Sequence, residues 1–291
     1  MAAATEWTPW KKVEGEAMDF RDIIYEKKYR AHGGGVARLS FNRPERMNAF
    51  TDEGIKELII ALDDLSRDRT IGVGVITGVG DNFGTGGDVG WEAAGGLHQA
   101  FLLGGVGFNT ALRRCRKPTI AAVKGYCIGG SHHLAYFCDF TVAADNAIFG
   151  QTGPKVGSPA HGFVVTYLSR VVGPKKGREI WMMCRQYTAQ EALQIGLVNT
   201  VVPLERLEAE VDQWCDELLD RCPTIIELQK ASFDRDIDYM EGDFGRYLSM
   251  MAPDFFYGPE PKEAQAAYFE KRRPNFWKDR MPGFLEPEGE K

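Results

Sequence analysis

The chain has 291 residues, of which 44% are hydrophobic and 26% charged, with a net charge of −6 and a pI near 5.5. This acidic balance excludes a broad nucleic-acid surface, which needs clustered Lys and Arg. No apolar run approaches the roughly 20 residues of a membrane-spanning helix. Without a basic segment followed by an apolar one at its start, the chain is expected to be cytoplasmic. The six cysteines form no C-x-x-C pair and are expected to be reduced, packed thiols.

Strand and helix signals alternate through the first part of the chain. Residues 1–20 show no clear period, and we expect this N-terminal extension to cover a neighbouring surface with its Trp and Phe side chains. IIYEKKY and VARLSF, separated by glycines, indicate a hairpin. A helix is predicted from an N-cap at Thr51 to about Leu65, because its apolar residues fall on one face. IGVGVITG then reads as a buried strand.

Two glycine-rich turns follow. DNFGTGGDVG precedes a helix predicted over about 97–114, and the strand PTIAAVKG leads to the turn CIGGS, which opens a short helix. DFTVAAD and AIFG come next, and from about Phe163 the segments are nearly all helical. Strand, loop, helix and strand in this order imply an α/β protein with a mostly parallel sheet. We therefore predict an α/β core over 21–204 and a helical C-terminal region over 205–291.

The glycine turns are the first candidates for a functional site, because ligands of α/β sheets collect where strands end. Steric demand alone explains a glycine in a tight turn with positive φ. The pairing of the turns favours function: each follows a buried strand, and the second begins a helix whose first N–H groups have no intrahelical partner. N–H groups near Gly87 and Gly130 can converge on one oxygen.

Four motifs carry a resemblance that spans roughly residues 20 to 280. They are N-R-P-x-x-x-N-A-F from Asn42, F-G-T-G-G-D from Phe83, G-Y-C-I-G-G-S-H from Gly125 and C-D-F from Cys138. Together they resemble the enoyl-CoA hydratase/isomerase, or crotonase, superfamily. The resemblance implies a crotonase-like ββα spiral core and an oxyanion hole at the positions of Gly87 and Gly130. It also implies an acyl-CoA substrate. Coenzyme A then enters as part of the substrate, and no tightly bound cofactor is expected.

Within the superfamily, four later stretches are most similar to the naphthoate synthase and 2-ketocyclohexanecarboxyl-CoA hydrolase branch. They are G-Q-T-G-P-K-V-G-S from Gly150, R-V-V-G-x-K-K-x-R-E-I-W from Arg170, G-L-V-N-T-V-V-P from Gly196 and E-K-R-R-P-N-F from Glu270. Members of that branch close or open a ring beside a thioester enolate. The resemblance also implies a homotrimer or a dimer of trimers, with the C-terminal region covering the active site.

The chain departs from its relatives at their acid/base positions. His133 and Gly153 stand where hydratases of the superfamily carry two glutamates, so glutamate-dependent hydration is not expected. In the branch, a glycine at this place leaves space for a bicarbonate ion beside residues that match Gln151 and Thr152. Histidine suits proton transfer at neutral pH, because its unperturbed pKa is about 6.5. His133 is therefore a catalytic candidate, against the alternative that it only packs.

A second departure lies after Ser158, which is a candidate substrate contact or an ordinary turn serine. The branch carries an aspartate two positions later, whereas this chain has Ala160 followed by His161. His161 is the second catalytic candidate. The substrate loop VGWEAAGGLHQA offers Trp91 but no Lys or Arg, which suits an apolar alicyclic or aromatic acyl group.

Four further positions match residues that line the site or contact coenzyme A in the branch. Tyr257 and Tyr268 are expected at the substrate, and Lys271 and Arg46 at the phosphates of coenzyme A, with solvated surface as the alternative for the two cations. No His, Cys or carboxylate spacing is typical of a metal site, so no metal is expected.

These features predict hydrolytic C–C cleavage of a cyclic β-keto acyl-CoA. The alternatives are hydration of a cyclic or hydrophobic unsaturated acyl-CoA, ring closure of the 1,4-dihydroxy-2-naphthoyl-CoA synthase type, and an inactive acyl-CoA binding subunit. The sequence leaves the acyl group and the direction of reaction open.

Overall fold

A computed structural model describes residues 6–96, 98, 107–241 and 246–277. Its main sheet has seven strands in the order β1-β2-β3-β4-β5-β7-β10. Their bounds are β1 (Lys11–Lys12), β2 (Ile23–Tyr29), β3 (Gly35–Phe41), β4 (Ile71–Gly78), β5 (Thr119–Val123), β7 (Phe140–Ala144) and β10 (Thr200–Val202). The pairs from β3 to β10 are parallel, whereas β1–β2 and β2–β3 are antiparallel. The predicted hairpin and the mostly parallel sheet are confirmed.

A second sheet of three short strands holds the segment that follows β5. Its order is β6-β8-β9, with β6 (Tyr126–Ile128) parallel to β8 (Ile148–Gly150) and β9 (Gln186–Thr188) antiparallel to β8. The sequence pattern missed β6, β9 and β10. Each has three residues, which is too short to display a hydrophobic period.

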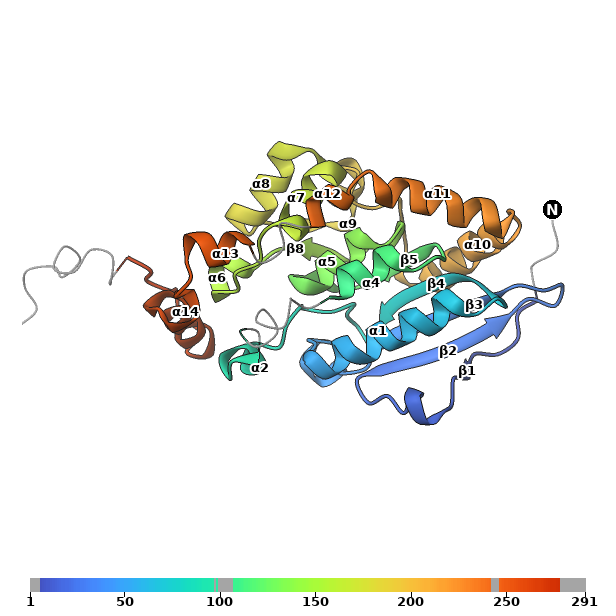
Figure 1. The fold of residues 1–291 in the computed structure, drawn as a ribbon, viewed down its shortest axis with the longest axis horizontal. Coiled ribbons are helices and arrows are strands. Elements are labelled where there is room, and N and C mark those ends of the chain that lie inside the picture. The colour runs from blue at the N-terminus through green and yellow to red at the C-terminus, as the bar shows by residue number, and fades with distance from the viewer. Residues whose placement is uncertain (1–5, 97, 99–106, 242–245, 278–291) are drawn as a thin grey trace, which may run out of the picture.

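Helices cover both faces of the main sheet (Figure 1). In chain order they are α1 (Asp52–Arg67), α2 (Val89–Ala93), α4 (Phe108–Arg114), α5 (Gly130–Phe137), α6 (Gly153–Val156), α7 (Phe163–Val172), α8 (Pro174–Met183), α9 (Ala189–Gln194), α10 (Leu207–Leu219), α11 (Pro223–Arg235), α12 (Asp238–Glu241), α13 (Arg246–Met251) and α14 (Pro259–Phe269). Of the helix predicted over 97–114, the part from 108 is observed, and 97 and 99–106 lie outside the described residues. Among the helices described, none combines the length and apolar composition needed to cross a bilayer.

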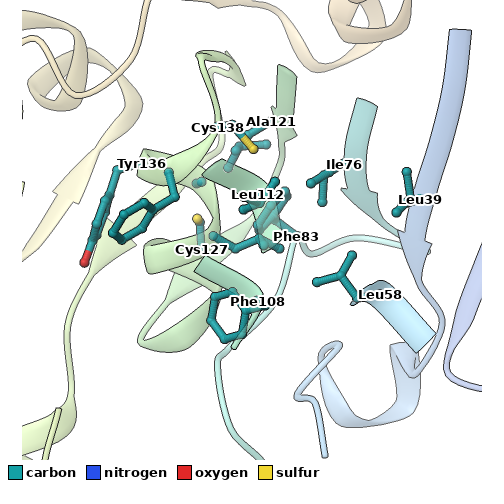
Figure 2. Close-up of a cluster of buried hydrophobic side chains, with 14 of the residues drawn as sticks. Leu39, Leu58, Ile76, Phe83, Phe108, Leu112, Ala121, Cys127, Tyr136 and Cys138 are labelled. Carbon is teal, nitrogen blue, oxygen red and sulfur yellow. The ribbon is translucent and has the colours of Figure 1, made fainter. Parts of the chain in front are cut away.

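The alternation of side chains along the strands creates two cores. On β5, Ala121 and Val123 join the larger core with α1, α4 and α5, whereas Ile120 and Ala122 join the smaller core with α10. Figure 2 shows part of the larger core, where Phe108 and Leu112 of α4 lie beside Phe83. Because α10 packs on the sheet itself, the start of the C-terminal region is part of the α/β core.

The N-terminal extension has more structure than its sequence suggests. Residues 11–12 pair with β2, although no element was expected there. Trp7 and Trp10 pack against the smaller core, as predicted, and the Lys28 ammonium lies 4.6 Å and 4.5 Å from their ring centroids. The ammonium also pairs with Asp212 Oδ1 at 2.5 Å, and this ion pair together with the cation–π contacts explains how a buried lysine is accommodated on β2.

Helix α1 begins as predicted after Thr51, although the Thr51 side chain makes no capping hydrogen bond. The acidic Asp52 and Glu53 instead favour the helix N-terminus through its dipole. Buried Glu57 accepts backbone N–H bonds from residues 21, 22 and 23 at 2.8–2.9 Å, which fixes α1 to the start of β2. All six cysteines are free thiols, and only Cys222 is exposed.

Candidate active site

A cavity of about 690 Å³ lies where the two glycine turns meet. One turn follows β4, and the other joins β6 to α5. Further wall residues come from the loop after β3 and from α2, α6 and α14. The cavity thus collects segments from most of the chain, at the ends of strands, as expected for a ligand site of an α/β sheet.

The two turns are in direct backbone contact. Gly86 has a φ of +86°, and a Cβ on it would lie 2.7 Å from the Gly130 backbone nitrogen. A Cβ on Gly130 would in turn collide with the ring of Phe50. The Phe50 backbone bridges the first turn, donating to the Gly86 carbonyl and accepting from the Asp88 N–H, both at 2.9 Å. Glycine is therefore required at positions 86 and 130, because the Gly130 backbone and the Phe50 ring, respectively, lie too close to leave room for a side chain.

Two N–H groups of these turns have no hydrogen-bond partner among the described residues. Gly87 and Gly130 both line the cavity, and neither N–H donates a hydrogen bond to any residue that the structure describes. The neighbouring Gly86 N–H, by contrast, donates to Ser131 Oγ at 3.0 Å. An N–H group without a partner is costly in a protein interior, which makes this pair suited to an oxygen atom of a ligand.

His133 on α5 places an imidazole on the same wall. Its ring lies 5.1 Å from that of Trp181, and only 8% of the residue is exposed. Burial lowers the pKa of His133 to about 4, so the imidazole is neutral at pH 7 and can accept a proton. The adjacent His132 is off the wall, as the turn of about 100° per helical residue predicts, and its Nδ1 lies 3.0 Å from Gln151 Nε2.

Glu92 on α2 is a wall residue to which the sequence patterns assigned no role. Asp88 caps α2 by accepting the N–H groups of Gly90 and Trp91, and this places Glu92 one turn later beside Gly87. A Cβ on Gly87 would approach Glu92 Oε1 to well under 3.0 Å. Burial, with the charge of Asp88 as a smaller cause, raises the pKa of Glu92 to about 7. The sequence signal that could have placed Glu92 at the cavity is its position four residues after Asp88, the N-cap of α2.

Most of the predicted substrate residues are on the wall. They are Arg46, Gln151, Thr152, Gly153, Ser158 and Tyr268, together with Gly87, Gly130 and His133. Arg46 is half-exposed, and its Nε lies 3.3 Å from Asp88 Oδ2. Tyr268 comes from α14, which packs on α6 where a Cβ on Gly157 would meet Ala264.

Four predicted residues are not among the wall residues as placed. His161 Nδ1 lies against the Pro159 carbonyl, and the Tyr257 ring meets the His98 ring edge-on at 5.3 Å. Trp91 packs against Gly96, and Lys271 follows α14 as an exposed residue with a φ of +54°. The roles assigned to these four residues stay predictions.

The surroundings of Gly153 bear on the expected bicarbonate. Gln151 Nε2 is already close to two acceptors, His132 Nδ1 and the Gly129 carbonyl, and a Cβ on Gly153 would lie 2.9 Å from the Ser158 carbonyl oxygen. An engaged amide and a carbonyl oxygen do not fit an anion such as bicarbonate. In the described ranges no group of three His, Cys, Asp or Glu side chains could hold a metal ion.

Comparison with known proteins defines the family. Residues 31–280 match the sequence profile of the enoyl-CoA hydratase/isomerase family. An enoyl-CoA hydratase/isomerase structure from Xanthobacter autotrophicus Py2 is 31% identical, with a TM-score of 0.74 over 86% of this chain and 94% of the other. An enoyl-CoA hydratase from Mycobacterium avium subsp. paratuberculosis is 22% identical and shares the fold, with a TM-score of 0.74 over 88% and 99%. The chain belongs to the enoyl-CoA hydratase/isomerase (crotonase) family, whose members act on acyl-CoA thioesters.

Proposed function

We propose that this enzyme opens the ring of a cyclic β-keto acyl-CoA by hydrolysis. The observation that carries the proposal is the placement of His133, a neutral imidazole, on the wall that also holds the unengaged N–H groups of Gly87 and Gly130. The two N–H groups suit a thioester enolate oxygen. The imidazole suits the activation of water.

The reaction consumes one water molecule. His133 accepts a proton from water while the oxygen attacks the ring ketone, which gives a tetrahedral alkoxide. Collapse of this alkoxide breaks the bond to the α-carbon, and the electron pair moves into the thioester as an enolate. The Gly87 and Gly130 N–H groups hold the enolate oxygen, and one such donor is typically worth ~2.7–4 kcal/mol. Protonation of the α-carbon completes an open-chain acyl-CoA that carries a new carboxyl group.

The wall favours an apolar acyl group over a carboxylated one. Ala49, Ile128, Val156 and Ala160 contribute apolar surface. The cation that lines the wall in the described residues is Arg46, which is half-exposed and pairs with Asp88. A cation in this position suits the phosphates of coenzyme A at the mouth, whereas a carboxylated aromatic ring inside would lack a counter-charge. Ring closure of the naphthoate synthase type is therefore the weaker candidate.

The expected homotrimer or dimer of trimers belongs to this proposal. Large apolar side chains of the C-terminal helices are exposed in the single chain, including Phe233 at 80% and Met251 at 81%. Contact between subunits would remove such exposed apolar side chains from water. Light scattering of the purified protein would measure the mass and decide among monomer, trimer and hexamer.

The test is a panel of cyclic β-keto and cyclic enoyl-CoA thioesters, with the product identified by mass and NMR. Ring opening gives a new carboxyl group, and hydration gives a new alcohol. We expect His133→Ala to lower kcat/KM for ring opening by about 100-fold, within the usual range for a general base. His161→Ala is assayed beside it. If both variants stay within tenfold of the wild type, the assignment of histidine as the base is wrong.

Hydration of a cyclic enoyl-CoA is the second candidate, because Glu92 adds a carboxyl group to the wall that holds His133. A carboxyl group and an imidazole could share the proton transfers of water addition. A product with a new alcohol and an intact ring would establish hydration. Adding and removing bicarbonate in the same assays tests the predicted surrogate base, since a true requirement appears as a loss of turnover on removal.

A further inference from the structure

The Glu92 carboxyl group is the least explained group of the cavity wall. It is half-buried on α2, and within the described ranges it makes no hydrogen bond or ion pair. An acidic side chain rarely lies inside a protein without a partner. The neighbouring Asp88, in contrast, is engaged by two backbone N–H groups and by Arg43 and Arg46.

The position of Glu92 relative to Gly87 is specific. Glu92 Oε1 occupies the space that a side chain on Gly87 would need, so the carboxyl group lies directly over the Gly87 backbone. In the proposed reaction the Gly87 N–H holds the enolate oxygen. The α-carbon is two bonds away from that oxygen, which puts it within reach of a group beside Gly87.

We propose that Glu92 is a catalytic residue that exchanges a proton with the α-carbon of the bound thioester. The inference rests on the proposed enolate chemistry and assigns its last step. In ring opening, His133 takes the proton from water and the carboxylic acid of Glu92 gives its proton to the enolate carbon. Solvent then returns a proton to Glu92 and removes one from His133, so that the net change up to this point is the uptake of one water. Ionisation of the new carboxyl group of the product afterwards releases one proton.

The charged and titratable groups of the cavity wall are consistent with His133 as the base and Glu92 as the acid. Asp88 lies on its own loop, Glu45 and Arg46 come from the segment after β3, His133 from α5 and Tyr268 from α14. Arg46 pairs with Asp88 instead of Glu92, and in the part of the chain that the structure describes no cation pairs with the Glu92 carboxyl group. Burial raises its pKa to about 7, which leaves both the acid and the carboxylate populated near neutral pH.

The experiment measures proton exchange at the α-carbon independently of ring opening. Cyclohexanecarbonyl-CoA has one α-hydrogen and no ketone, so it can exchange that hydrogen in D2O without being cleaved. We expect the wild type to catalyse the exchange, measured by mass spectrometry, and Glu92→Gln to slow it by at least about 100-fold. Binding of the thioester, measured by calorimetry, should change by less than about threefold. Glu53→Gln on α1, an exposed position, is the matched control and should behave as wild type.

Three results would overturn the inference: exchange by Glu92→Gln within about threefold of the wild type, loss of binding and exchange together, or no exchange by the wild type. His133→Ala should keep most of the exchange while losing cleavage. An enzyme that exchanges the α-hydrogen through Glu92 but opens no cyclic β-keto thioester would leave Glu92 assigned and refute the proposed function. Cleavage by Glu92→Gln at the wild-type rate would support the proposed function and refute the role of Glu92, whereas a slowed residual cleavage is the expected result.

Discussion

The cavity wall has two parts. In one, the backbone side, Gly87 and Gly130 contribute backbone N–H groups. In the other, the side-chain side, His133 and Glu92 contribute titratable side chains. The backbone side is fixed by packing, because the glycine turns touch each other and Phe50 joins them. The side-chain side depends on single residues, and the resemblance implies that His133 stands where hydratases carry a glutamate. In the proposed reaction, stabilisation of the enolate therefore depends on the backbone packing, while the fate of the enolate depends on single side chains.

The largest expected effect is on the backbone side. In Gly86→Ala the new methyl group would meet the Gly130 nitrogen, and its φ of +86° disfavours alanine. We expect kcat/KM to fall by ~10²–10³-fold, the cost of losing one oxyanion donor. Gly80→Ala is the control, since Gly80 also has a positive φ of +72° and its Cβ would meet only Pro44. Equal activity losses in both variants would attribute the effect to backbone strain alone.

The pH profile tests the side-chain side. His133 must be neutral to accept a proton, so kcat/KM for ring opening should rise with pH through about 4 and then level off. Glu92 must be protonated to donate, so the rate should fall tenfold per pH unit above about 7. α-Hydrogen exchange, which first needs the carboxylate as a base, should rise through the same pKa. In Glu92→Gln the decline of cleavage above pH 7 should disappear, and a decline that persists would be assigned to another group.

Phe50 connects the two sides and offers a test of intermediate size. Its ring lies against Gly130 and is 6% exposed. Phe50→Leu should lower the free energy of unfolding by about 1–2 kcal/mol, as for the loss of part of a buried side chain. Because the ring supports Gly130, one of the two proposed oxyanion donors, kcat should fall by about tenfold while the KM stays near that of the wild type. A stability loss with unchanged kcat would show that the turns hold their geometry without it.

The smallest effect is expected at the rim. Tyr268 is a wall residue and Tyr257 is not, although the sequence assigned both to the substrate. Tyr268→Ala should raise the KM by about three- to fivefold with kcat unchanged, because it removes contact area and no charge. Tyr257→Ala in the same assay should behave as wild type. A larger effect at Tyr257 would place it in a site completed by a neighbouring subunit.

The sequence anticipated features that repeat over many residues or depend on glycine. The β2–β3 hairpin, α1 and β4 all have periods long enough to recognise, and the glycine turns stand out because steric crowding excludes other residues. The short strands β6, β9 and β10 were missed, since three residues carry no period. Their positions follow from pairing with segments far away in the chain.

At the candidate active site, the sequence by itself predicted the paired glycine turns and, through the resemblance, a histidine at position 133 where hydratases carry a glutamate. Both predictions depend on the identity of residues at single positions. Only the tertiary structure decided which side chains share the cavity. It put Glu92 over Gly87 through the cap that Asp88 forms, and it put His161 against a backbone carbonyl away from the wall. Burial, which shifts the pKa of His133 down and that of Glu92 up, is likewise a property of the packed chain and of no local pattern.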